Sequence, residues 1–276
     1  MAQYYDDYKK SHSMTSSDIY YIMDDLQNIK KYYNQTISKY DGMFNSLGSC
    51  STHVDIEQDW KTLENYYLLE SENSCSLYKL GIFYENKQKY DQMKKYYGYA
   101  IERNYSDAMN NLGCYYYNIE KDMPNTEKYL LMGGDKSNVN SMYNLGIYYA
   151  YAQDYANMEK YYIMSITTSN NNCVKAMFNL GNYYRVKQDY INMTKYYLMA
   201  IDKNHTGSMF NLGYYYQCVG EHMLMEKYYL MAIKNCDNMA MNNLGLYYKN
   251  INDSVNMLKY LNLAIKFGNP NGIKNI

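Results

Sequence analysis

The sequence has few of the residues that break or cross-link a chain. Its 276 residues include 2 prolines, 1 tryptophan and 5 phenylalanines, and its 6 cysteines form no Cys-x-x-Cys pair. Scattered cysteines without a short disulfide framework favour free thiols. No apolar run approaches the roughly 20 residues that cross a bilayer, and the start shows neither a secretory signal nor a lipidation motif. We therefore expect an intracellular, cytoplasmic protein that does not bind membranes.

An excess of one charge is also lacking. Lys and Arg number 27 and Asp and Glu number 28, for a net charge of −1, and the two signs are interspersed. A nucleic-acid binder normally carries a basic stripe that exchanges counterions with phosphates, so no nucleic acid is expected as a partner.

Motifs for chemistry are missing as well. The 4 histidines have no metal-ligand spacing with Cys, Asp or Glu. No GxSxG, Walker or dinucleotide-binding fingerprint occurs. The sequence thus predicts a protein that is not an enzyme and has no metal and no cofactor.

Tyrosine is what the chain has in abundance, with 41 residues, beside 21 methionines and many Asn, Lys and Ile. This bias is typical of an AT-rich genome. It suits a large DNA virus or an amoebal host, and for a viral protein the location would be the host cytoplasm.

The dipeptide Leu-Gly recurs six times along the chain. Its glycines are Gly81, Gly113, Gly146, Gly181, Gly213 and Gly245, with spacings of 32, 33, 35, 32 and 32. The neighbours repeat too, as in AMFNLGNYY (176–184), and a second block such as MTKYYLMAI (193–201) follows each glycine except Gly113, where it is degenerate. Such self-similarity indicates a repeat protein.

Both blocks have the spacing of amphipathic helices. Met142, Leu145, Gly146 and Tyr149 fall at i, i+3, i+4 and i+7, and polar stretches separate the two blocks. Each unit is therefore helix, turn, helix, and such short pairs must stack to bury their apolar faces. Glycine within a helix costs about 1 kcal/mol against alanine, so we expect close approach of the paired helix at each glycine.

The unit resembles a tetratricopeptide repeat or its Sel1-like relative. The copy at 176–201 matches the pattern at Asn179, Leu180, Gly181, Tyr184, Asp189, Tyr190, Tyr197, Ala200 and Ile201. Methionine stands where the family prefers alanine in the second helix, and the unit after Gly113 has one extra residue in its turn. The resemblance implies an all-α fold, an α-solenoid of about six to eight antiparallel helix-turn-helix repeats.

Two regions are predicted along the chain. Residues 1–75 would form degenerate N-terminal repeats or a cap, with NIKKYYNQTI (28–37) and GMFNSLG (42–48) as a remnant. Residues 76–276 would form the array. Its units are expected near 76–107, 108–140, 141–175, 176–207, 208–239 and 240–276.

The tyrosines fall into two sets. Those three residues after each glycine are predicted core residues: Tyr84, Tyr116, Tyr149, Tyr184, Tyr216 and Tyr248. Their preceding neighbours are either packed between units, the favoured reading, or partly exposed for binding: Phe83, Tyr115, Tyr148, Tyr183, Tyr215 and Tyr247.

The resemblance implies a non-catalytic scaffold or adaptor that binds a protein or peptide on the concave face lined by the first helices. Carried onto this sequence, that face comprises Tyr143, Asn144, Ile147, Phe178, Asn179, Asn182, Arg185, Phe210, Asn211, Tyr214 and Gln217. The asparagine that recurs two residues before the glycines either contacts a partner or is a capping or solvated residue, the second reading being slightly favoured. The rival hypotheses are a single-stranded RNA binder and an enzyme, or the regulatory subunit of an enzyme complex, with chemistry in the segment 50–75.

Overall fold

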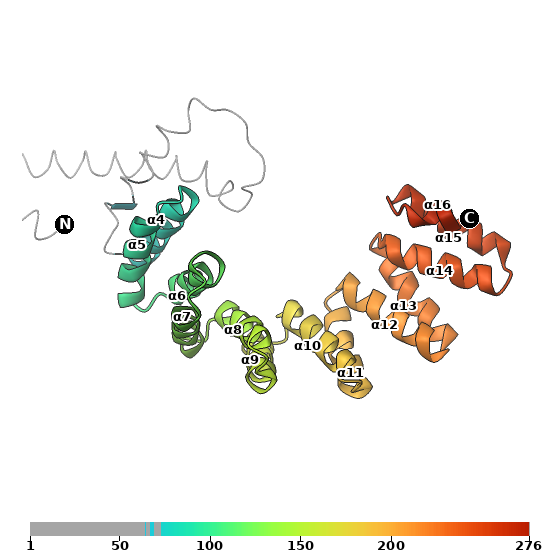
Figure 1. The fold of residues 1–276 in the computed structure, drawn as a ribbon, viewed down its shortest axis with the longest axis horizontal. Coiled ribbons are helices and arrows are strands. Elements are labelled where there is room, and N and C mark those ends of the chain that lie inside the picture. The colour runs from blue at the N-terminus through green and yellow to red at the C-terminus, as the bar shows by residue number, and fades with distance from the viewer. Residues whose placement is uncertain (1–63, 65–66, 69–72, 276) are drawn as a thin grey trace, which may run out of the picture. The chain divides into compact units, whose positions relative to one another are not determined.

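The computed structural model describes residues 64, 67–68 and 73–275, and every structural statement below concerns these residues. The predicted repeat remnants at 28–37 and 42–48, and Cys50 and Trp60, lie outside the described residues. From residue 74 onward, helices joined by short turns follow one another along the chain (Figure 1).

The chain divides into two compact units, Met1–Lys136 and Ser137–Ile276. In the first, the helices are α4 (Ser74–Asn86), α5 (Tyr90–Glu102), α6 (Ser106–Tyr115), the π-helix η1 (Tyr116–Glu120) and α7 (Met123–Asp135). In the second they are α8 (Val139–Tyr151), α9 (Tyr155–Thr168), α10 (Val174–Val186), α11 (Tyr190–Ile201), α12 (Thr206–Val219), α13 (His222–Lys234), α14 (Asn238–Asn250), α15 (Ser254–Lys266) and α16 (Asn271–Asn275).

Each Leu-Gly lies on the first helix of a packed pair. The pairs are α4 with α5, α6 with α7, α8 with α9, α10 with α11, α12 with α13, and α14 with α15. The predicted all-α solenoid of helix-turn-helix repeats is thereby confirmed. Which residues form the repeats before residue 73, and the boundary at 75/76, stay predictions.

The turn within each pair is specified by two local devices. An aspartate caps the second helix in several units: the carboxylate of Asp189 accepts the backbone N–H of Asn192 at 3.1 Å and the amide of the Asn192 side chain at 2.7 Å. The residue just before the cap adopts a left-handed conformation, as at Gln188 with φ of 59°. These devices end the first helix and begin the second within a few residues.

The extra residue predicted after Gly113 is taken up by a π-helix. Where the other first helices run straight into the turn, α6 is followed by η1, and Lys121 then takes the left-handed turn position with φ of 56°. A π-helical turn holds one more residue than an α-helical turn, so the insertion leaves the pairing of α6 with α7 intact.

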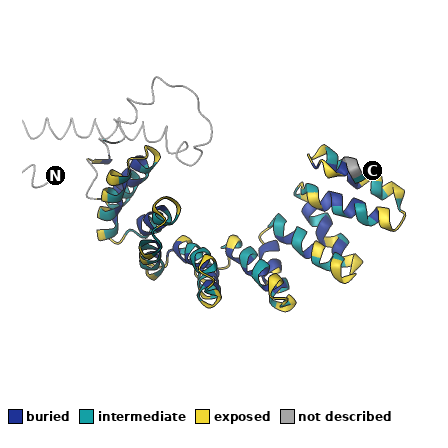
Figure 2. Ribbon diagram, in the orientation of Figure 1, coloured by how far each residue is buried: buried dark blue, intermediate teal, exposed yellow. Residues whose placement is uncertain are grey.

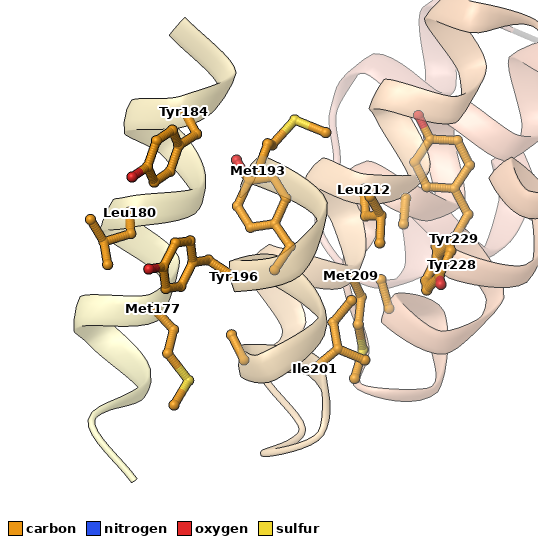
Figure 3. Close-up of a cluster of buried hydrophobic side chains, with 14 of the residues drawn as sticks. Met177, Leu180, Tyr184, Met193, Tyr196, Ile201, Met209, Leu212, Tyr228 and Tyr229 are labelled. Atoms are coloured by element: carbon orange, nitrogen blue, oxygen red, sulfur yellow. The ribbon is translucent and has the colours of Figure 1, made fainter. Parts of the chain in front are cut away.

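Aromatic stacking joins the two helices of every described pair. The tyrosine three residues after each glycine lies nearly parallel to a tyrosine of the second helix, with ring centroids 5.2–5.7 Å apart and interplanar angles of 9° or less. Of the six predicted core tyrosines, Tyr84, Tyr184 and Tyr248 are buried and Tyr116, Tyr149 and Tyr216 are partly buried. Buried residues lie between the paired helices (Figure 2), and Figure 3 shows such a cluster around Met193 and Tyr196.

Four of the six preceding aromatics pack against the preceding helix pair, as the favoured interpretation predicted: Tyr115, Tyr183, Tyr215 and Tyr247. Tyr183 of α10 contacts Tyr155 of α9, with centroids 5.6 Å apart, and Tyr215 of α12 contacts Tyr190 of α11 at 5.0 Å. Tyr247 of α14 contacts His222 of α13 at 5.2 Å. These contacts hold successive helix pairs together at their turn ends.

Candidate functional site

The predicted binding residues lie on the first helices of three successive pairs in the second unit. Tyr143, Asn144 and Ile147 are on α8, the residues from Phe178 to Arg185 are on α10, and those from Phe210 to Gln217 are on α12. Arg185 and Tyr214 are exposed and the other nine are partly buried. We call these eleven residues the first-helix surface.

The repeated glycine determines what lies beneath this surface. A Cβ at Gly181 would come within 2.4 Å of the Tyr197 ring, and one at Gly146 within 2.4 Å of the Tyr162 ring. A Cβ at Gly245 would instead come within 2.8 Å of the Leu261 side chain. The predicted close approach is thus an approach of a second-helix side chain, most often a tyrosine ring, to the bare backbone of the first helix. Tyr197 is completely buried as a result.

The hydroxyl of each of these buried tyrosines needs hydrogen-bond partners, since an unsatisfied buried hydroxyl is costly. The recurring asparagine of the next unit supplies one. The Asn179 amide donates to the Tyr162 hydroxyl at 3.2 Å, that of Asn211 to Tyr197 at 3.1 Å and that of Asn243 to Tyr229 at 3.3 Å. In the compact unit Met1–Lys136, the Asn111 amide donates to the Tyr97 hydroxyl at 3.3 Å.

The recurring asparagine therefore joins one helix pair to the next, a role that sequence reasoning missed. In these four copies it is neither a helix cap nor a freely solvated residue. The signal was present in the sequence, since a tyrosine stands sixteen residues after Gly81, Gly146, Gly181 and Gly213, and an asparagine stands two residues before the next glycine in each case. Spacing alone did not reveal that the two side chains meet across the unit boundary.

The densest polar group on the surface surrounds the Tyr197 hydroxyl. This hydroxyl donates to Asn182 Oδ1 at 2.7 Å, and the Asn211 amide donates to the same oxygen at 3.0 Å. Burial raises the pKa of Tyr197, and the Asn211 hydrogen bond and the nearby Arg185 guanidinium partly oppose that rise. Asn182, Arg185 and Asn211 are thereby brought together at the contact between α10 and α12.

Hydrogen-bonding capacity is left over in this group. Among the described residues, nothing accepts from the Asn182 amide nitrogen and nothing donates to Asn211 Oδ1. The same hydrogen bonds that hold the two asparagines therefore leave a donor and an acceptor available on adjacent helices.

Aromatic rings flank the polar group. Phe178 packs on the Tyr197 and His205 rings, with centroids 6.2 and 4.8 Å apart, and Phe210 packs on the Tyr229 ring at 6.0 Å. The Tyr214 side chain is 46% exposed. Gln217, by contrast, is occupied by the Tyr229 hydroxyl, which donates to its Oε1 at 2.6 Å.

At the α8 end of the surface, Tyr143 packs on Tyr162 with centroids 5.9 Å apart, and Asn179 donates to the Tyr162 hydroxyl. Burial raises the pKa of Tyr143, and the neighbouring Asn179 amide partly opposes that rise. A cavity of about 350 Å³ adjoins Tyr143 and is also lined by Val139, Asn140, Val174 and the loop 169–173 that follows α9. This end of the surface is thus hollowed beside an aromatic ring.

Among the described residues, no three His, Cys, Asp or Glu side chains gather in a way that could hold a metal ion. Within the described range, no helix is both long and apolar enough to span a bilayer. The described cysteines are free thiols, as expected: Cys75, Cys114, Cys173, Cys218 and Cys236. Most of the segment 50–75 lies outside the described residues.

The fold matches solved repeat structures. The antigen c5321 of uropathogenic Escherichia coli, which has an SLR fold, superposes with a TM-score of 0.64 at 17% identity over 90% of this chain and 57% of its own. A Sel1 repeat protein of Oxalobacter formigenes gives 0.55 at 21% identity over 70% of this chain and 88% of its own. The human IFIT1 dimer with PPP-AAAA gives 0.55 at 15% identity over 91% of this chain and 63% of its own.

These similarities define the class of protein by its fold. The chain has the helical-repeat fold of Sel1-like and tetratricopeptide proteins, which confirms the resemblance found in the sequence. It spans less than two thirds of the length of c5321 and of the IFIT1 chain. The amino-acid sequence matches no family model and no curated protein.

Proposed function

We propose that the protein is a non-catalytic scaffold and that its first-helix surface binds an extended segment of a partner protein. The observation that carries this proposal is the polar group around Tyr197. Its free donor on Asn182 and free acceptor on Asn211 match the C=O and N–H of a peptide backbone. Because Tyr197 holds both asparagines in place, little side-chain entropy would be lost on binding.

The flanking side chains support the same occupant. Tyr214 and the partly buried Phe178 and Phe210 offer rigid apolar area for the side chains of a peptide. Arg185 is the single charged residue among the eleven, which favours a peptide with a carboxylate near its centre. One cation is too few for strong contact with a phosphate backbone, so single-stranded RNA is the weaker alternative.

The test is selection of peptides from a random displayed library against the wild-type protein. Selected peptides are then measured by fluorescence anisotropy against the variant Arg185→Ala/Tyr214→Ala, whose two side chains are exposed and hold no part of the core. The matched control is Arg103→Ala/Tyr99→Ala, an exposed Arg and an exposed Tyr at the C-terminal end of α5.

We expect the Arg185/Tyr214 variant to bind at least about tenfold more weakly, the loss of a charged contact and an aromatic contact, and the control to bind as wild type. Equal binding by both variants would place the peptide elsewhere and refute the assignment. Salt-sensitive binding of single-stranded RNA that is lost in the Arg185/Tyr214 variant would favour the RNA alternative instead.

A further inference from the structure

A second surface follows the turns between the paired helices. Ile191, Met223 and Val255 each stand two residues after the cap of a second helix, and their side chains are 84%, 87% and 79% exposed. Val186, Val219 and Ile251, at the ends of the preceding first helices, are 76%, 50% and 52% exposed. Three successive helix pairs thus each present two apolar side chains, which together we call the turn-edge row.

The turns that carry the row lie side by side. Ring contacts near the turns join Tyr190 to Tyr215 and His222 to Tyr247, and α10 contacts α12 directly, as α12 contacts α14. Contacting helices have axes about 8–10 Å apart. The first-helix ends that carry Val186, Val219 and Ile251 therefore recur about every 8–10 Å along one edge of the second unit.

The fold does not require apolar residues at these positions. In the pair formed by α4 and α5, Lys87 and Asp91 stand where Val219 and Met223 stand in the pair formed by α12 and α13, and both are exposed. Six exposed aliphatic side chains gathered on adjacent turns are unlike the singly scattered apolar residues of an ordinary surface. Such a concentration marks an interaction surface.

Acidic side chains run beside the row. The cap positions of the same three second helices hold Asp189, Glu221 and Asp253, and the pKa of Asp189 and of Asp253 is lowered by hydrogen bonds from Asn192 and Asn256. The carboxylates of Asp189 and Asp253 are therefore ionised at neutral pH. Lys187 is a cation of this edge, and its ammonium lies over the Tyr183 ring at 4.7 Å.

We propose that the turn-edge row is a docking site for a basic amphipathic helix of another protein. An α-helix with apolar residues every seven positions repeats them about every 10 Å, which is close to the separation expected between the contacting first helices α10, α12 and α14. Lys or Arg beside those apolar residues would meet Asp189, Glu221 and Asp253. This surface is separate from the first-helix surface, and its failure would leave the proposed peptide site untouched.

The probe is a synthetic helix of three heptads with Leu at the two core positions and Lys beside them, labelled and held at low concentration for anisotropy. One control peptide has the same composition with the leucines at irregular spacing, and another has Glu in place of Lys. The protein variant is Ile191→Ser/Met223→Ser/Val255→Ser. The matched variant is Leu198→Ser/Met239→Ser/Phe267→Ser, which removes exposed apolar side chains outside the row.

We expect the wild type to bind the basic heptad peptide, with affinity falling as salt rises, and to bind both control peptides at least about tenfold more weakly. The row variant should lose at least about tenfold in affinity, while the matched variant stays within about twofold of wild type. Equal binding of the irregular peptide, or equal binding by the row variant, would overturn the proposal. The proposal would also be overturned if the wild type did not bind the peptide and sedimentation showed a dimer that the row variant abolishes. The occupant of the row would then be a second copy of this chain.

Discussion

Alanine at Gly181 tests the central packing contact of the repeat. The new Cβ would lie 2.4 and 2.5 Å from the Cδ1 and Cε1 atoms of Tyr197, in the body of a completely buried ring. The ring cannot move without loosening the hydroxyl from Asn182 and Asn211. Overpacking costs about 1–3 kcal/mol and the weakened hydrogen bonds about 1 kcal/mol more, whereas alanine gains about 1 kcal/mol of helix propensity. We expect Gly181→Ala to lower the free energy of unfolding by about 1–3 kcal/mol.

The same substitution at Gly98 is the matched control and should have the opposite sign. Gly98 lies within α5, and a Cβ there would meet nothing within 4 Å. Only the helix propensity remains, so Gly98→Ala should raise stability by about 0.5–1 kcal/mol. Urea denaturation followed by circular dichroism at 222 nm measures both changes. A Gly181→Ala protein as stable as wild type would refute the close contact with Tyr197.

Three further predictions concern the turns and the titratable groups. Gln188 and Gly220 each have a positive φ (59° and 80°), a conformation that favours glycine. Gln188→Gly should therefore raise the free energy of unfolding by about 0.5 kcal/mol and Gly220→Ala should lower it by about 1 kcal/mol. The midpoint of urea denaturation measures both changes. The pKa of Asp189 is lowered by hydrogen bonds from Asn192. The stability that this carboxylate confers is therefore complete above the unfolded pKa near 4 and is lost as pH falls through the lower folded pKa. The melting temperature of Asp189→Asn should depend less on pH between about 5 and 3 than that of the wild type, and an unchanged dependence would contradict this. Burial raises the pKa of Tyr229 to about 12. The stability that its buried hydroxyl confers is therefore present below the ordinary tyrosine pKa near 10 and is lost as pH rises toward 12. Absorbance at 295 nm should show tyrosines that ionise only well above pH 10, and Tyr229→Phe should reduce their number; ionisation of all tyrosines near pH 10 would contradict the raised pKa.

The helical repeat could be predicted from the sequence because its cause is local. Leu-Gly and the apolar residues three and four positions apart specify one helix face, and that face determines which residues are buried. The burial of Tyr184 and the stacking role of Tyr183 followed from the same periodicity. Even the extra residue after Gly113 was visible in the sequence, although only the structure shows that it forms η1.

The details of the site could not be predicted in the same way because they depend on contacts between units. Asn179 and Asn211 were assigned to partner binding or to solvated positions from their register on one helix. The structure shows that each amide is held by the tyrosine of the preceding pair. A hydrogen bond across two helix pairs depends on how those pairs stack, and the period of a repeat does not contain that information.

These inter-unit hydrogen bonds change which residues can report on partner binding. Replacing Asn179 or Asn211 would leave a buried tyrosine hydroxyl short of a partner and weaken the stacking of units, so lost binding in such a variant would not distinguish a damaged scaffold from a lost contact. Arg185 and Tyr214 are exposed, and their side chains can be removed at little structural cost. The same reasoning separates the two proposed surfaces, since Ile191, Met223 and Val255 contribute nothing to the core that supports Arg185 and Tyr214. A protein in which the Arg185/Tyr214 and turn-edge variants each abolish a different ligand would be an adaptor that holds two partners at once. One in which both variants abolish the same ligand would instead bind a single, larger partner across both surfaces.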